Sequence, residues 1–199
     1  MNPKRKRLFT VIMISACIIL ALIALVFLRF RGSTRIKPSF DIVPGTDIVR
    51  YRQDDPKWAD EHLGNSKYTL DSSGCLVSCI ASALSMEHDM EENPSTLNAR
   101  LSSDGVYDSE GNIQWEGLRQ STGHQVDLPS DISSDTIDSY LSRGVFPIVR
   151  VRMYALGNAH YVLIVKAENG RYWCMDPLKD ELTDLSDYGN RIYAIRCVY

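Results

Sequence analysis

The stretch Ser72–Met86, SSGCLVSCIASALSM, decides the fold class of the soluble part. Small residues at positions 72–74 are typical of a helix start, and an apolar run rich in Leu, Val, Ile and Ala follows from Cys75. The pattern predicts a helix over Cys75–Met86. Its free N–H groups and partial positive charge would stabilise a thiolate in the first turn. Cys75 is therefore a candidate nucleophile, whereas Cys79, one turn further in among apolar neighbours, is expected in the core.

Around this helix the sequence predicts helices first and strands afterwards. Two further short helices fit Pro94–Leu101 and Asp135–Ser142. The second is expected to be capped by Ser134 and closed by Gly144. Candidate strands are Val145–Val151, Tyr161–Val165, Tyr172–Met175 and Ile192–Val198. The Asn169-Gly170 pair predicts a hairpin turn between the middle two strands. Helices followed by an antiparallel sheet indicate an α+β fold.

The amino-terminal part is a different kind of segment. No residue from Leu8 to Leu28 is charged. At a rise of ~1.5 Å per residue this run spans roughly 30 Å, the thickness of the hydrocarbon core of a bilayer. It predicts a transmembrane helix over residues 8–30. A cleaved signal peptide is the competing interpretation, but its apolar region is usually only ~7–15 residues long and ends in small residues.

Basic residues at both ends of the apolar run bear on its orientation. The cluster at positions 4–7 lies on a tail too short to hold a domain, which favours an amino terminus inside the cell and the rest of the chain outside. The predicted organisation is a cytoplasmic tail over 1–7, the membrane helix, a linker over 31–44 containing Gly32, Pro38 and Pro44, and one domain over 45–199. The predicted location is the cell membrane, with a single pass.

The chain from Asp41 onward is acidic. It holds 25 acidic and 14 basic residues, a balance of about −11. No stripe of Lys and Arg is present to bind phosphates, so nucleic acid is not an expected partner. A solvated acidic surface without any partner is the favoured interpretation, and a cationic substrate stays open.

A thiolate nucleophile needs a general base, and the chain has four histidines. His62 and His88 stand among charged residues, a context typical of the solvated surface. His124 follows a glycine in a loop-like segment. His160 opens an apolar strand, a rigid element that can fix its ring. A histidine at a strand end is often structural, but Cys75 upstream favours catalysis.

Asp176 ends the strand that is predicted to form a hairpin with the strand of His160. It can therefore lie beside the imidazole, orient it and stabilise its cationic form. On its own, Asp176 followed by proline would be an ordinary exit from a strand. The combination of Cys75, His160 and Asp176 carries the hypothesis of nucleophilic catalysis.

The remaining cysteines and tryptophans have structural interpretations. Cys174 and Cys197 fall on candidate strands that can lie side by side, so both a disulfide and two buried thiols are open, with thiols favoured. Only Cys75 and Cys79 approach the spacing of metal ligands, and no metal or cofactor is expected. Trp58 and Trp115 are expected to anchor the core or loops rather than to stack on a substrate.

Five segments of the chain together resemble a known family. They are Tyr51–Trp58, Ser73–Ala81, Asn93–Asn98, Ala159–Val162 and Met175–Pro177. They are similar, in order, to motifs of family thirty-nine of the cysteine peptidases, the papain-like peptidases of bacteriocin exporters and their stand-alone relatives. This chain departs from many stand-alone relatives in having Leu76 and Val77 directly after the cysteine, where those have Gly and Pro.

The resemblance implies a papain-like fold with a Cys75–His160–Asp176 triad and with Gln53 donating its amide to the oxyanion; Asn65 is the alternative donor. Together with the predicted membrane helix and its orientation, it implies a membrane-anchored, extracytoplasmic peptidase acting on a peptide or protein. Two alternatives stay open: a hydrolase or transpeptidase of peptidoglycan stem peptides with the same triad, and a binding module that no longer turns over substrate. The oligomeric state is not predicted.

Overall fold

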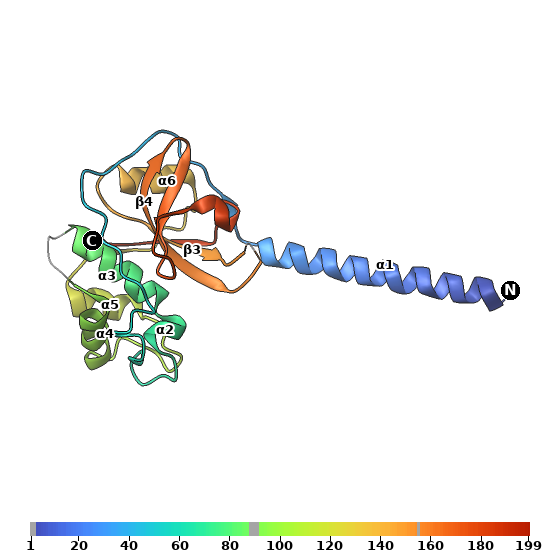
Figure 1. Cartoon of the computed structure of the whole chain (residues 1–199), viewed down its shortest axis with the longest axis horizontal. Helices are drawn as coiled ribbons and strands as arrows, with labels where there is room; N and C mark the ends of the chain where they lie inside the picture. The colour runs from blue at the N-terminus through green and yellow to red at the C-terminus, as the bar shows by residue number, and fades with distance from the viewer. Residues whose placement is uncertain (1–2, 88–91, 155) are drawn as a thin grey trace. The chain divides into compact units, whose positions relative to one another are not determined.

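Two compact units make up the chain, Met1–Ser33 and Thr34–Tyr199 (Figure 1). The computed structural model describes residues 3–87, 92–154 and 156–199. His88, which was expected at the surface, lies outside the described residues.

The first unit is a single helix, α1 (Pro3–Phe30). The segment expected as a tail over 1–7 continues this helix from Pro3 onward. Within it, Phe9–Phe30 contains an 18-residue stretch with a mean hydropathy of 3.2 and is long and apolar enough to cross a bilayer. Its side chains from residue 9 to residue 28 are exposed all round, a pattern that suits lipid surroundings. A signal sequence near an amino terminus meets the same criteria of length and composition.

The second unit begins at Thr34, within the segment expected to be a linker over 31–44. Here β1 (Thr34–Arg35) pairs antiparallel with β7 (Arg191–Ile192). Ile36 is buried in the core, and Ile42 forms a β-bridge with Ala167. The segment therefore belongs to the folded unit rather than to a spacer. Its glycine and prolines favour a loop, but its two isoleucines find partners far along the chain.

The three predicted helices form with slightly shifted ends. The structure has α3 (Cys75–Glu87), α4 (Pro94–Ser103) and α6 (Ser134–Leu141). The cap of α6 is Ser133, whose side chain accepts a hydrogen bond from the Thr136 N–H. Ser134, predicted as the cap, is instead the first helical residue. Of two adjacent serines, the one with extended backbone takes the capping position.

Two helices were not predicted. The first, α2 (Leu70–Ser73), is a single turn with a capping box at Thr69. The second, α5 (Trp115–Thr122), is mostly polar, has no side-chain cap at Gln114, and is held in place by its buried Leu118. Both are short; α2 has a local cap, whereas packing of Leu118 stabilises α5.

The second half of the unit is an antiparallel sheet with strand order β2-β8-β3-β4-β5-β6. Its strands are β2 (Val126–Asp127), β3 (Ile148–Arg152), β4 (Ala159–Glu168), β5 (Arg171–Met175), β6 (Thr183–Asp184) and β8 (Ala194–Val198), with a 3-10 turn η1 (Leu185–Tyr188) after β6. The predicted strand over 192–198 is split at Tyr193 into β7 and β8. Asn169 and Gly170 both have positive φ, 55° and 70°, which confirms the hairpin turn between β4 and β5.

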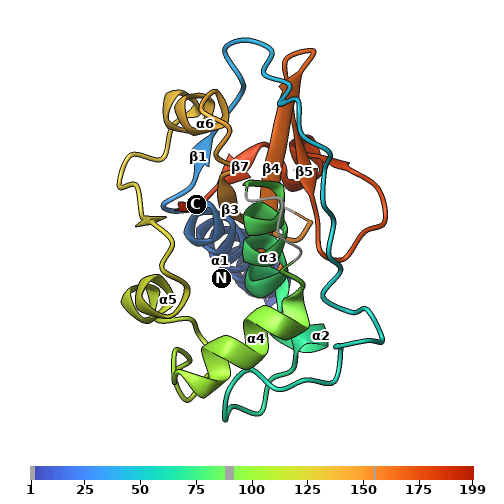
Figure 2. The ribbon, with the colours of Figure 1, turned by 90° about the vertical axis from the view of Figure 1, so that its left-hand side faces the viewer.

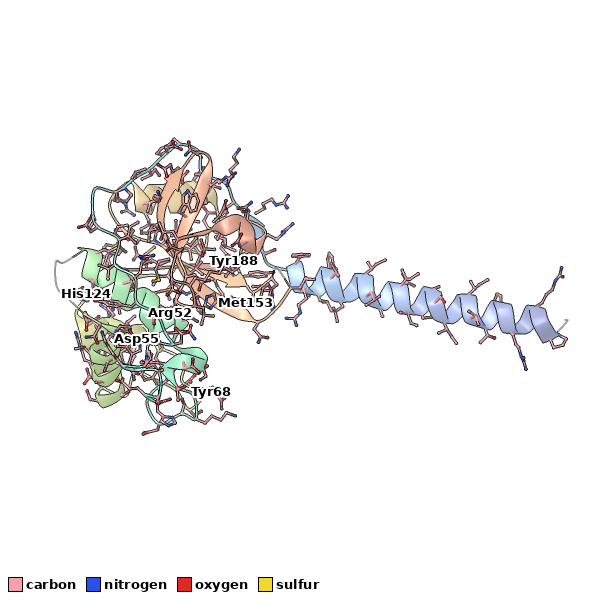
Figure 3. All side chains as sticks on the ribbon, viewed as in Figure 1. Arg52, Asp55, Tyr68, His124, Met153 and Tyr188 are labelled. Carbon is pink, nitrogen blue, oxygen red and sulfur yellow. The ribbon has the colours of Figure 1, made fainter. Side chains whose placement is uncertain are left out.

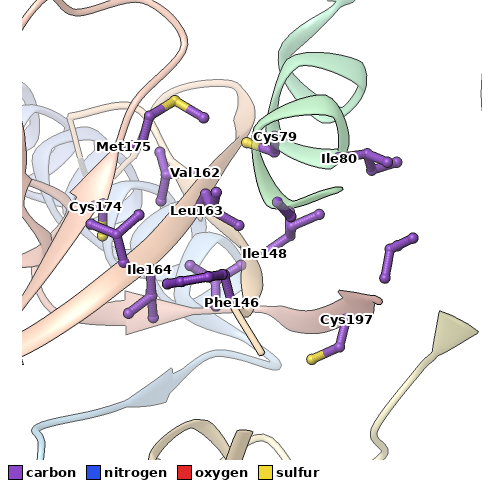
Figure 4. Packing of buried hydrophobic residues seen from close by; sticks show 14 of the residues in the cluster. Cys79, Ile80, Phe146, Ile148, Val162, Leu163, Ile164, Cys174, Met175 and Cys197 are labelled. Carbon is purple, nitrogen blue, oxygen red and sulfur yellow. The ribbon is translucent and has the colours of Figure 1, made fainter. Parts of the chain in front are cut away.

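Helix α3 packs on β4 and carries the core (Figure 2). Cys79 of α3 lies near Val162 and Leu163 of β4 in the buried cluster (Figure 4). A mixed α+β architecture with helices on an antiparallel sheet is thereby confirmed. It places the start of α3 against the start of β4.

Cys174 on β5 and Cys197 on β8 are buried, and neither forms a disulfide. Their strands are not neighbours, because β3 and β4 lie between them. Three strand spacings of about 4.8 Å separate the two strands, well beyond the reach of a disulfide. The expectation that these strands could lie side by side is wrong, and the two thiols fill the core.

Candidate active site

A tight junction between two helices sets the position of Cys75. The Gly74 N–H donates to the carbonyl of Leu70 at 2.7 Å, and α3 begins at the next residue. A Cβ on Gly74 would lie 2.5 Å from the Leu70 oxygen, so only glycine fits between α2 and α3. Cys75 is half-buried at the first turn of α3. Its backbone N–H is among those that a helix start leaves without an intrahelical partner.

The other cysteine of this helix is in the core, as predicted. Cys79 is fully buried and its Sγ lies 3.6 Å from the carbonyl oxygen of Tyr161. Burial raises the pKa of Cys79 well above its ordinary value, and nearby acidic groups add to the effect. A thiol in this position stays protonated and unreactive.

The strands bring His160 and Asp176 together. The β4–β5 register pairs Leu163 with Met175, which puts Asp176 diagonally across from His160 on the same face. The His160 Nε2 and the Asp176 Oδ1 are 2.6 Å apart, and both residues are buried, with 3% and 1% exposure. The predicted pair is therefore in direct contact.

Asp176 is held at both oxygens. The backbone N–H of Leu178 donates to Oδ1 at 3.0 Å, and the hydroxyl of Tyr188 donates to Oδ2. Burial alone would raise the pKa of Asp176, but the hydrogen bond and charge of His160, with the bonds from Tyr188 and Leu178, hold it below its ordinary value. Asp176 is therefore a carboxylate fixed in orientation.

The surroundings of His160 favour its protonated, cationic form. Burial works to lower its pKa, but hydrogen bonds and charge interactions with Asp176 and Cys75 outweigh burial and raise the pKa of His160 to about 9. Because Nε2 faces Asp176, Nδ1 is the ring nitrogen left available for the Cys75 thiol.

Gln53 lies between the two halves of this site. It is buried, with 4% exposure; its backbone N–H donates to the Pro177 carbonyl at 3.0 Å, and its side-chain Nε2 donates to the carbonyl of Asp71 in α2. Its Oε1 is buried without a hydrogen-bond partner among the described residues. A primary amide has two N–H donors, so one remains after the bond to Asp71. Gln53 is tied to the residue after Asp176 and to the helix before Cys75.

Two residues of this region were missed in the sequence. Arg52 binds Asp54 through two nitrogens at 2.8 and 2.6 Å and also binds Asp180, which joins the Gln53 segment to the loop after Asp176. Arg52 directly precedes Gln53, so its place in the chain could have marked it as part of this region. Tyr188 lies in a turn after β6, and no local pattern marks it.

The alternative residues lie elsewhere. His62 is exposed, and its Nδ1 is 3.1 Å from the Ser66 carbonyl. His124 is well separated in projection from Tyr188, the partner of Asp176 (Figure 3). Asn65 is exposed and lines a separate hollow of about 200 Å³, which includes none of the triad residues.

Replacement of Tyr188 tests how firmly Asp176 is held. Tyr188→Phe should lower turnover by about 10-fold or more, because a hydrogen bond to a charged group contributes roughly 1.5–3 kcal/mol. The unrestrained carboxylate should then attract the imidazolium proton more strongly. The alkaline limb of the pH–rate profile, set by the raised pKa of His160 near 9, should move to higher pH.

Tyr172→Phe is the matched control for this variant. The Tyr172 hydroxyl donates to Asp138 at 2.6 Å in another buried Tyr–Asp pair, outside the site. Its loss should lower the free energy of unfolding without moving the pH–rate profile. Identical pH–rate profiles for the two variants would show that Tyr188 only supports the fold.

Comparison with solved structures identifies the fold. The crystal structure of a "putative C39-like peptidase" from Bacillus anthracis matches with a TM-score of 0.55 and 11% identity, over 81% of this chain and 98% of that chain. No protein-family model matches the sequence, and no curated protein does. The chain therefore has the fold of a C39-like peptidase, the family that its motifs resemble.

Proposed function

We propose that the folded unit is a cysteine peptidase that hydrolyses peptide bonds through Cys75, His160 and Asp176, and that α1 anchors it in a membrane with the unit on the outer side. The observation that carries the proposal is the buried, 2.6 Å contact between His160 and Asp176, which holds the imidazole in one orientation; interactions with Asp176 and Cys75 raise its pKa. A base held in this way favours a thiolate–imidazolium pair over two neutral groups.

The geometry supports a two-step reaction. The Cys75 thiolate attacks the peptide carbonyl carbon, the new S–C bond forms, and the C–N bond breaks as the His160 imidazolium gives its proton to the leaving amine. A water then attacks the thioester and loses a proton to the neutral imidazole. The S–C bond breaks, which releases the acid product and restores the ion pair. Asp176 keeps the ring oriented and stabilises its positive charge throughout.

Two donors are available for the negative oxygen that forms during the attack. One is the backbone N–H of Cys75 at the start of α3, and the other is the second N–H of Gln53. The bonds of Gln53 to Pro177 and Asp71 hold its amide without any need for substrate. Such preorganised donors stabilise the transition state more than the bound peptide.

Alkylation tests the choice of nucleophile. Iodoacetamide at mildly acidic pH should modify Cys75 well before Cys79, Cys174 or Cys197, because the ion pair keeps Cys75 reactive and the other three thiols are buried. Peptide mapping by mass spectrometry after short exposure measures the order. Cys75→Ser should abolish the fast phase. Preferential modification of Cys79 would overturn the assignment.

Protease treatment of intact cells tests the membrane topology. Protease added outside should digest the unit from Thr34 onward or strip it from the membrane, because the positive residues at positions 4–7, before the apolar run, favour an inner amino terminus. The intact mass of the isolated protein should still include α1. A unit protected until the membrane is broken would contradict the outer location, and a mature chain without α1 would contradict the anchor.

A further inference from the structure

A pocket of about 180 Å³ opens beside Cys75. We propose that it binds one uncharged, apolar side chain of the substrate, within two residues of the cleaved bond, and so selects peptides that carry one there. The inference rests on the proposed peptidase function and adds the class of substrate to it. Six of its lining residues carry the argument: Cys75, Leu76, Val77, Ile113, Trp115 and Tyr161.

The pocket touches both halves of the catalytic site. Cys75 and Leu76 come from the first turn of α3, and Tyr161 directly follows His160 on β4. Ile113 lies just before α5, and Trp115 is the first residue of that helix. A peptide whose carbonyl carbon reaches the Cys75 sulfur must place a neighbouring side chain next to these walls.

The residues that line the pocket disfavour a charged side chain of the substrate. No described residue that lines the pocket is charged, although the chain from Asp41 onward has 25 acidic residues. Six of the ten lining residues are aliphatic or aromatic, and the polar side chains, which include Ser73, Asn112 and Tyr161, are neutral. A charged side chain of the substrate would lose hydration and find no opposite charge on a lining residue, whereas an apolar one would release water from both surfaces.

The size of the pocket fits one side chain. At roughly 30 Å³ per water in the liquid, its 180 Å³ is the volume of about six water molecules. Sites for whole drug-sized ligands are larger, about 300–1,000 Å³. A branched aliphatic or aromatic side chain is therefore a better occupant than glycine, which would leave the pocket filled with water.

The walls are formed before substrate arrives. Val77 and Ile113 are buried in the core, and the guanidinium of Arg196 lies 5.4 Å from the centre of the Trp115 ring. Trp115 was expected to anchor the core or a loop. In the structure it also lines the pocket. A rigid pocket discriminates by size as well as by polarity.

Hydrolysis of activated esters tests the selectivity. The probes are p-nitrophenyl esters of N-acetyl-X and N-acetyl-X-glycine, with X as Gly, Leu, Phe, Glu or Lys, assayed on the full chain. In at least one series kcat/KM for Leu or Phe should exceed that for Gly, Glu and Lys by roughly 10–200-fold. Equal rates in both series, or a preference for Glu or Lys, would overturn the inference.

Two variants assign the selectivity to this pocket. Leu76→Trp fills it and should reduce the preference for Leu over Gly at least tenfold, while Trp115→Ala enlarges it and should move the optimum from Leu towards Phe. Asn65→Trp is the matched control, because it fills the neighbouring hollow of about 200 Å³ and should keep the parent preference. If both pocket variants remain folded and keep the parent preference, the inference is wrong.

The alkylation rate and the ester kinetics together distinguish a failure of this inference from a failure of the proposed function. Fast alkylation of Cys75 with hydrolysis of esters but no selectivity rejects only the pocket. Failure of the parent to hydrolyse any ester, together with slow alkylation of Cys75, rejects the peptidase function, and the inference falls with it.

Discussion

His160→Ala should lower the rate of hydrolysis by roughly 10⁴–10⁶-fold and leave the unit folded, since the loss of one member of a catalytic triad removes nearly all the advantage of the others. Two roles disappear with the imidazole: stabilisation of the Cys75 thiolate and delivery of a proton to the leaving amine. His160 is buried, so the variant also loses its bond to Asp176 and leaves a cavity. Thermal unfolding should accompany the kinetic assay, to show that the protein being assayed is folded.

The pH dependence of hydrolysis by the parent is a second test of the role of His160. The raised pKa of His160, about 9, means that the ring stays protonated at neutral pH and loses its proton only as pH rises through that value. Peptide hydrolysis by the parent should therefore decline above about pH 9, where no proton remains for the leaving amine. The exposed His62, changed to Ala, is the control and should behave as the parent. Substantial hydrolysis by His160→Ala would overturn the assignment of His160 as the base.

Gln53→Ala should lower hydrolysis by roughly 10²–10³-fold, the cost of removing one oxyanion donor. Alkylation of Cys75 by iodoacetamide should stay close to the parent rate, because that reaction forms no oxyanion. The two rates, measured on the same preparation, separate stabilisation of the transition state from activation of the nucleophile. A parallel fall in both rates would mean that Gln53 supports the surroundings of Cys75 instead.

Gln53 is buried, so a structural effect needs its own control. Asn98 is also a buried amide, with 3% exposure, and its side chain donates to the His62 carbonyl at 3.1 Å, outside the triad. Asn98→Ala should cost stability in a similar way, about 1–3 kcal/mol for a carbonyl left without a donor, and should retain most hydrolysis. Unimpaired hydrolysis in Gln53→Ala would leave the Cys75 backbone N–H as the principal oxyanion donor.

Local patterns predicted the parts of the fold that local forces determine. The small residues before Cys75 mark a helix start, and Asn169-Gly170 forces a turn, so α3 and the β4–β5 hairpin followed from short stretches of sequence. The hairpin then placed Asp176 beside His160. The prediction that Cys75, His160 and Asp176 lie close together rested partly on these elements and partly on the family resemblance.

Contacts between distant residues were not predictable in this way. The pairing of Thr34 with Ile192 and the bond from Tyr188 to Asp176 depend on how the whole sheet closes. Likewise, α5 forms around the buried Leu118 in a stretch that is otherwise polar. Hydrophobic periodicity and turn residues describe neighbours along the chain, whereas these features depend on neighbours in space.

Cys75 and His160 belong to different layers of the unit, one on α3 and the other on β4. Catalysis tolerates little misplacement, since an error of about 1 Å can cost 10²-fold in rate. A slight slip of the helix over the sheet would separate thiol from imidazole while every helix and strand stayed intact. Loss of turnover on heating, or after a mild change in the α3–β4 packing, should therefore precede loss of the circular dichroism signal. The rate of turnover should therefore respond to small changes in the packing of α3 on β4 that leave the secondary structure intact.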